Sequence, residues 1–173
     1  MKNSIILSIV NLLFKVLINR GFKNFYFELL DLFVVDLKYN TRTFVRKNNI
    51  KNNYVPYYTV IFKKNVQKLN KIISFKNTYF IDLGSGKGRI LLSSSELEFE
   101  KIIGIEKDKK LFNECKKNIT KNNLNKKIQL INEDFTKIKI KIPPKRNLIF
   151  FWYGSSSSCL LKKIIFNYKK KFK

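Results

Sequence analysis

The stretch at residues 78–108 constrains the fold more than any other part of the chain. A short apolar run at residues 79–81 leads into the sequence DLGSGKGR at residues 82–89, and a second apolar run at residues 102–105 ends at Glu106. Because apolar residues between the two runs recur at helical spacing, the order is strand, glycine turn, helix, strand and acid. This order is typical of one half of a nucleotide-binding α/β fold.

The spacing of the glycines narrows the class of ligand. Gly84, Gly86 and Gly88 follow the pattern G-x-G-x-G, whereas a dinucleotide site requires G-x-G-x-x-G and a P-loop requires G-x-x-x-x-G-K-[ST]. Asp82, directly before the turn, would repel a pyrophosphate docked on a helix N-terminus. The pattern therefore favours a ligand that carries positive charge and no phosphate, as S-adenosylmethionine does.

Together these residues resemble motif I of the class I S-adenosylmethionine-dependent methyltransferases. Glu106 stands where that family has an acid for the ribose hydroxyls, and Asp134 follows a third apolar run, where the family places an acid against the adenine. Glu133 is the alternative adenine acid, and Phe135 would flank the base. The resemblance implies a cofactor site formed by Tyr54, Asp82, Gly84, Ser85, Gly86, Gly88, Glu106, Asp134 and Phe135.

Tyr54 enters this set through a second, looser resemblance. The sequence Tyr-Val-Pro at residues 54–56 precedes a helical pattern. In lysine-methyltransferase-like proteins and in bacterial methyltransferases of unassigned substrate, a similar Y-x-P element lies near the donor pocket. Tyr54 is therefore expected either to line that pocket or to pack at the helix start.

Two further apolar runs complete the predicted sheet. Residues 128–131 and 147–152 have the composition of strands. We expect an α/β, Rossmann-like parallel sheet in the order 3-2-1-4 with helices on both faces. The full family fold has seven strands, so we expect a minimal or truncated form, one completed by a partner, or a damaged reading frame.

The domain organisation follows from the same patterns. Residues 1–53 are predicted to form an N-terminal helical extension, and residues 54–173 the methyltransferase domain, shortened at its end. Residues 1–20 have an amphipathic pattern, which indicates a helix packed on the domain or lying on a membrane surface. No transmembrane segment is expected, because the apolar stretch is short and carries a polar stripe.

Charge and residue usage bear on partners and metals. The 173 residues carry a net charge of +24, which favours nucleic acid or an anionic surface as a partner. Lys and Asn occur throughout, as an AT-rich coding bias would also produce. Histidine is absent and the two cysteines form no C-x-x-C pair, so we expect no metal site and a reducing, cytoplasmic location.

The predicted function is S-adenosylmethionine-dependent methyl transfer to an unidentified acceptor, with a protein side chain favoured over RNA or a small molecule. No residue stands out as a catalytic base. Residues 152–155 read WYGS, where amino-directed methyltransferases often have an N-P-P-Y-like element, and Tyr153 is either a pocket or a packing residue. The alternative is a catalytically impaired basic module that binds the donor or RNA.

Overall fold

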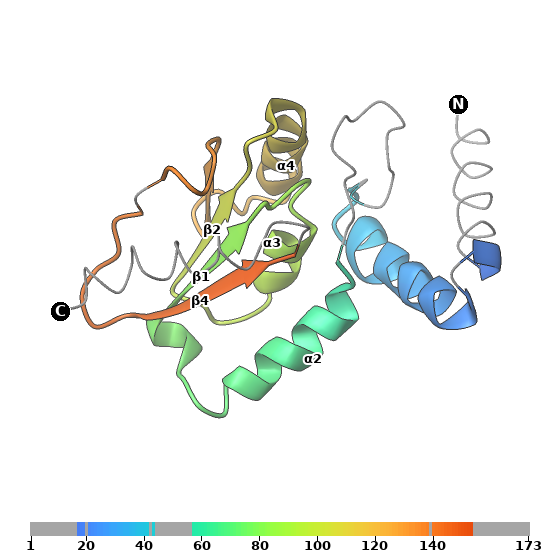
Figure 1. Ribbon diagram of the computed structural model, residues 1–173, viewed down its shortest axis with the longest axis horizontal. Coiled ribbons are helices and arrows are strands. Elements are labelled where there is room, and N and C mark those ends of the chain that lie inside the picture. Colours follow the sequence, from blue (N-terminus) through green and yellow to red (C-terminus); the bar gives the residue numbers. More distant parts are fainter. Residues whose placement is uncertain (1–16, 20, 42, 44–56, 139, 154–173) are drawn as a thin grey trace.

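The fold is organised around a four-stranded parallel sheet. The computed structural model describes residues 17–19, 21–41, 43, 57–138 and 140–153. Its strands are β1 (Thr78–Leu83), β2 (Lys101–Ile105), β3 (Ile128–Ile131) and β4 (Asn147–Trp152). They pair in the order β3-β2-β1-β4, all parallel (Figure 1). The predicted fold class and strand order are thereby confirmed.

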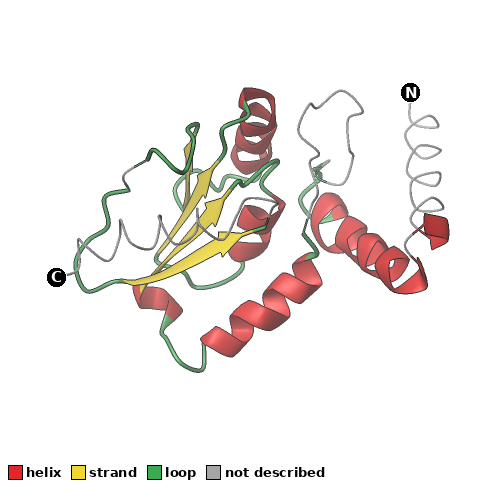
Figure 2. Cartoon of the chain, viewed as in Figure 1, coloured by secondary structure: helices red, strands yellow, loops and turns green. Residues whose placement is uncertain are grey.

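Helices precede β1 and lie between β1 and β2 and between β2 and β3, whereas a stretch without a described helix joins β3 to β4 (Figure 2). Residues 21–31 are helical, and the other helical elements are η1 (Leu32–Leu37), α2 (Thr59–Leu69), η2 (Phe75–Asn77), α3 (Arg89–Ser94) and α4 (Lys109–Lys121). The apolar spacing of the sequence predicts a longer helix, at about residues 87–97. The observed helix begins only at Arg89, because Gly88 before it has a left-handed backbone with φ of +84°.

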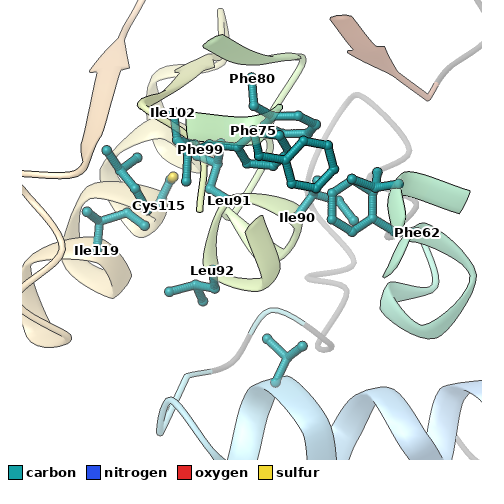
Figure 3. Close-up of a cluster of buried hydrophobic side chains, with 13 residues drawn as sticks. Phe62, Phe75, Phe80, Ile90, Leu91, Leu92, Phe99, Ile102, Cys115 and Ile119 are labelled. Atoms are coloured by element: carbon teal, nitrogen blue, oxygen red, sulfur yellow. The ribbon is translucent and has the colours of Figure 1, made fainter. Parts of the chain in front are cut away.

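One face of the sheet is covered by α2, α3 and α4. Their side chains converge on Phe80 of β1 and Ile102 of β2, with Phe62 arriving from α2, Leu91 from α3 and Cys115 from α4 (Figure 3). All six residues of α3 are buried, because this short helix lies between the sheet and the N-terminal segment.

The opposite face carries a second apolar cluster. Ile81, Leu83, Ile103 and Ile105 alternate with the residues of the first face, and Ile140 covers them together with partly buried side chains such as Phe135. In the described residues this cover is the stretch after β3 rather than a helix. The apolar spacing at residues 160–168 predicts a helix, which lies outside the described residues.

The N-terminal segment packs on the sheet-bound helices. Val35 of η1 belongs to the first core cluster. The Tyr39 hydroxyl donates to the carbonyl of Leu92 over 3.1 Å, and the Asn122 side chain donates to the carbonyl of Tyr39 over 3.0 Å. Residues 31–41 are therefore continuous with the core, while a domain boundary at residue 53 stays a prediction.

Residues 25–33 are rich in apolar and aromatic side chains, and part of this cluster is internal. The ring of Phe27 lies 5.4 Å from that of Tyr58, whereas Phe33 is exposed. The amphipathic stretch at residues 1–16 lies outside the described residues. Among the helices that are described, none has the length and hydropathy of a membrane span.

Candidate functional site

The glycine turn at residues 84–88 forms the centre of the candidate site. Gly84, Gly86 and Gly88 have φ values of +85°, +55° and +84°, a region that side chains with a Cβ rarely adopt. The N–H groups of Gly84 and Ser85 both donate to the carbonyl of Ile105, over 2.8 and 2.9 Å. The turn is therefore held against the carboxyl end of β2.

Gly88 also has a packing reason to be glycine. A Cβ added there would lie 2.6 Å from the sulfur of Cys115, so only a residue without a side chain lets the turn approach α4 this closely. Cys115 is fully buried, and burial raises the pKa of its thiol. It is a packing residue and not a reactive thiol.

Glu106 connects the turn to the start of α4. Its Oε2 accepts from the N–H of Gly86 and its Oε1 from the N–H of Asp108, each over 2.8 Å. The Asp108 carboxylate in turn caps α4 by accepting from the N–H groups of Lys110 and Leu111, as an aspartate directly before a helical pattern predicts. Each carboxylate oxygen of Glu106 retains a lone pair for a ligand hydroxyl.

Asp82 lies at the end of β1, beside this arrangement. It pairs in register with Gly104 of β2 and Phe151 of β4, and its side chain is buried. Burial, and next the negative charge of Glu106, raise the pKa of Asp82 to about 8. A cation bound here would offset both effects and favour the ionised carboxyl.

The acids predicted for the adenine lie at the same carboxyl edge of the sheet, just after β3. Asp134 accepts from the N–H of Thr136 over 2.9 Å, and Glu133 accepts from the N–H of Asp134 over 2.8 Å. Hydrogen bonds from Thr136 lower the pKa of Asp134. Phe135 packs partly into the second cluster. Both acids shape their own turn, so the choice between them stays a prediction.

Two tyrosines pack against each other near the end of β4. Tyr153, which follows β4, is a candidate from the sequence, whereas Tyr57, which precedes α2, is not. Tyr153 is 50% exposed, and its ring lies 4.8 Å from that of Tyr57, which in turn lies 5.3 Å from Phe151. Tyr57 was not assigned a role, although it directly follows the Y-x-P element. Tyr54 itself lies outside the described residues.

A buried ionic network beneath the turn escaped the sequence analysis. The Arg89 guanidinium lies 3.1 Å from the Asp31 carboxylate and 3.8 Å from that of Asp36. Its Nε donates to the hydroxyl of Thr43 over 3.0 Å. We call Asp31, Asp36, Thr43 and Arg89 the buried network, because all four are at least 95% inaccessible.

The buried network also organises the chain around it. Asp31 accepts from the N–H of Thr59 over 2.9 Å, and from the hydroxyl of Thr59, and so caps the start of α2 from a distant segment. Arg89 directly follows the glycine turn. The network therefore anchors the base of the turn to the N-terminal segment. The available sequence signal for the buried network was Arg89 itself, which stands where dinucleotide motifs have their third glycine.

Comparison with known proteins finds similarity to methyltransferases. The family model described as ribosomal protein L11 methyltransferase (PrmA) matches residues 62–143. No curated protein matches the chain. Similar solved structures include a predicted N6-adenine-specific DNA methylase from Listeria monocytogenes, at 13% identity and a TM-score of 0.50, covering 70% of this chain and 43% of that one.

Two further structures are similar over shorter or looser alignments. The tRNA methyltransferase TrmI from Aquifex aeolicus has 23% identity and a TM-score of 0.44, covering 53% of this chain and 36% of that one. The N-terminal domain of human METTL16, solved in complex with SAH, has 20% identity and a TM-score of 0.45, covering 67% and 45%.

The chain spans less than half the length of each of these three proteins. The similarity to the Listeria protein supports the assignment of the fold. The residues matched by the family model include the glycine turn, β1, β2, β3 and Glu106. The sequence-based resemblance is thereby confirmed: in fold and over residues 62–143, this chain is similar to the class I S-adenosylmethionine-dependent methyltransferases.

Proposed function

We propose that the chain binds S-adenosylmethionine at the carboxyl edge of its sheet and transfers the methyl group to an acceptor. The observation that carries the proposal is the pair of buried carboxylates, Asp82 and Glu106, at the glycine turn. Such a site suits a cationic ligand without phosphate, because a bound cation would favour the ionised form of Asp82, whereas an anion would meet the Glu106 carboxylate in a poorly solvated place.

Each of the site residues would contact a different part of S-adenosylmethionine. The turn at residues 84–88 would approach the methionine end through backbone, with Asp82 opposite its positive charge. Glu106 would accept from the ribose hydroxyls, a charge-assisted contact. Asp134 would accept from the adenine amino group, with Phe135 beside the base. S-adenosylmethionine supplies an electrophilic methyl group, so the protein's principal task is placement of the acceptor.

For the acceptor, we propose a protein side chain in the cytoplasm. The support is the resemblance to lysine-methyltransferase-like proteins and the partial match to the ribosomal protein L11 methyltransferase model. We place the acceptor beside the Tyr57–Tyr153 pair. The support is that Tyr153 follows β4, which ends in register with the end of β1, and β1 leads into the glycine turn. RNA is the competing acceptor, since TrmI acts on tRNA.

Calorimetry with S-adenosylmethionine tests the donor site. Glu106→Ala should weaken binding by about 1.5–3 kcal/mol, the scale of a hydrogen bond to a charged group. Glu98→Ala is the matched control, because its side chain is 74% exposed and belongs to a surface ion pair. Gly86→Val should abolish binding, since its backbone has φ of +55°. Circular dichroism verifies folding, and undiminished affinity in a folded Glu106→Ala variant would refute the site.

Turnover separates an enzyme from a module that only binds the donor. The protein is incubated with methyl-labelled donor and cell extract, and the product is digested with protease or ribonuclease. Label released by protease supports a protein acceptor, and label released by ribonuclease shows an RNA acceptor. Donor binding without any labelled product would favour the catalytically impaired module.

A further inference from the structure

The surface of the protein is more basic than its overall composition indicates, because most acidic side chains are buried or paired. All 12 acidic residues lie within the described part of the chain. Buried among them are Glu28, Asp31, Asp36, Asp82 and Glu106. Ion pairs with lysine or arginine engage Glu96, Glu98, Glu100 and Glu114. Most of the negative charge is therefore buried or matched, while the chain carries 36 lysines and arginines.

The outer face of α4 concentrates this positive charge. Its exposed lysines are Lys109, Lys110, Lys116, Lys117 and Lys121, and we call them the α4 lysine face. Helical spacing places them opposite the buried residues Leu111, Cys115 and Ile119. The residues between the lysines on this face are the polar Asn113 and Thr120.

No acid neutralises the α4 lysine face within the described residues. The only acid of α4 is Glu114, whose carboxylate lies 3.3 Å from the ammonium of the buried Lys87. Lys121 donates to the carbonyl of Asn40 over 2.8 Å, which orients that side chain without cancelling its charge. The face is therefore a row of positive charges with polar neighbours.

The position and length of α4 relate the face to the candidate donor site. The helix begins at Lys109, three residues after Glu106, so the lysines start next to the site in the sequence and continue along the helix away from it. Its 13 residues extend about 20 Å at about 1.5 Å per residue. That length matches about six phosphates of one nucleic-acid strand at about 3.4 Å each.

We propose that the α4 lysine face binds the phosphate backbone of a nucleic acid, as a binding partner separate from the protein acceptor proposed above. Lysines act there as point charges that recognise phosphates without reading sequence. An anionic membrane is a poorer fit, because surface-bound helices insert a row of apolar residues. Among the described residues of α4, the half-buried Phe112, whose ring centroid lies 5.3 Å from the Lys109 ammonium, is the one apolar side chain at the edge of this face. The binding surface does not depend on methyl transfer.

Fluorescence anisotropy with a labelled single-stranded RNA of about 20 nucleotides tests the proposal. The variant Lys110→Gln/Lys116→Gln/Lys117→Gln should bind at least about tenfold more weakly at low salt. Its plot of log affinity against log salt should be shallower by about 2, near 0.7 for each lost phosphate contact. The full chain is used throughout.

The matched control is Lys64→Gln/Lys68→Gln/Lys71→Gln, which removes three exposed lysines on or just after α2. It should change RNA affinity far less than the α4 variant. Equal weakening of RNA binding by both variants would show that the loss follows the net charge of the chain and not the α4 lysine face, and would overturn the proposal. Absence of RNA binding by the unmodified chain would also overturn it.

Two further measurements separate the remaining outcomes. Sedimentation with phosphatidylserine vesicles tests the membrane alternative: vesicle binding that depends on the α4 lysines, with RNA binding unaffected, would overturn the proposal. Calorimetry with S-adenosylmethionine on the α4 variant should give unchanged donor affinity, which shows that the site is folded. Loss of RNA binding with retained donor binding supports the lysine face independently of the methyltransferase proposal.

Discussion

Replacing Arg89 with leucine tests the buried network most directly. Arg89 and Asp31 are 2% and 0% exposed, so the substitution leaves a carboxylate in a place that water does not reach. Removal of one partner from a buried ion pair costs about 3–5 kcal/mol. Asp31 keeps its hydrogen bonds from Thr59, so we expect a loss of unfolding free energy near the lower limit, about 3 kcal/mol.

The loss should grow with pH. Burial raises the pKa of Asp31 above its ordinary value of 3.8, while the charge of Arg89 lowers it. Without Arg89 the pKa rises further, and the folded variant keeps a proton that the unfolded chain has already released. Since the folded state then binds more protons, the stability of the variant falls as pH rises toward that folded pKa.

Urea unfolding followed by circular dichroism, at about pH 5 and about pH 8, measures both effects. The control is Arg146→Gln, because Arg146 lies 2.6 Å from Glu100 in a pair with side chains 33% and 29% exposed. It should cost less than about 1 kcal/mol after screening by solvent. Adding Asp31→Asn to Arg89→Leu should restore part of the loss. A loss under about 1 kcal/mol, or one independent of pH, would refute the reasoning.

Two further predictions concern the glycine turn and its neighbours. In the folded chain Asp82 keeps its proton up to about pH 8, whereas the unfolded chain releases it near 3.8, so stability should fall with rising pH in that window, by up to about 1.4 kcal/mol per pH unit. Asp82→Asn should flatten this slope in urea titrations, and an unchanged slope would contradict the assignment. Gly84→Ala and Gly88→Ala both force a side chain into a left-handed backbone, at about 1–2 kcal/mol each. Only Gly88→Ala also meets the Cys115 sulfur at 2.6 Å, so it should lose at least about 1 kcal/mol more in thermal unfolding; equal losses would contradict the packing argument.

The sequence by itself determined the elements and their order. Apolar runs at residues 79–81 and 102–105, the glycine spacing between them and the Asp108 cap are local signals, each confined to a few neighbouring residues. Local sterics and hydrogen bonding respond to such signals directly. The parallel order β3-β2-β1-β4 then followed from known rules of strand connection.

The tertiary structure decided which charges meet. Arg89 and Asp31 are 58 residues apart in the sequence, and Arg89 and Thr43 are 46 apart. Glu106 could be placed at the end of β2, but its bond to Gly86 depends on how the turn folds back onto that strand. The periodicity of apolar residues in the sequence does not predict such pairings. The stability of a buried charge depends on partners that only the folded chain brings within reach.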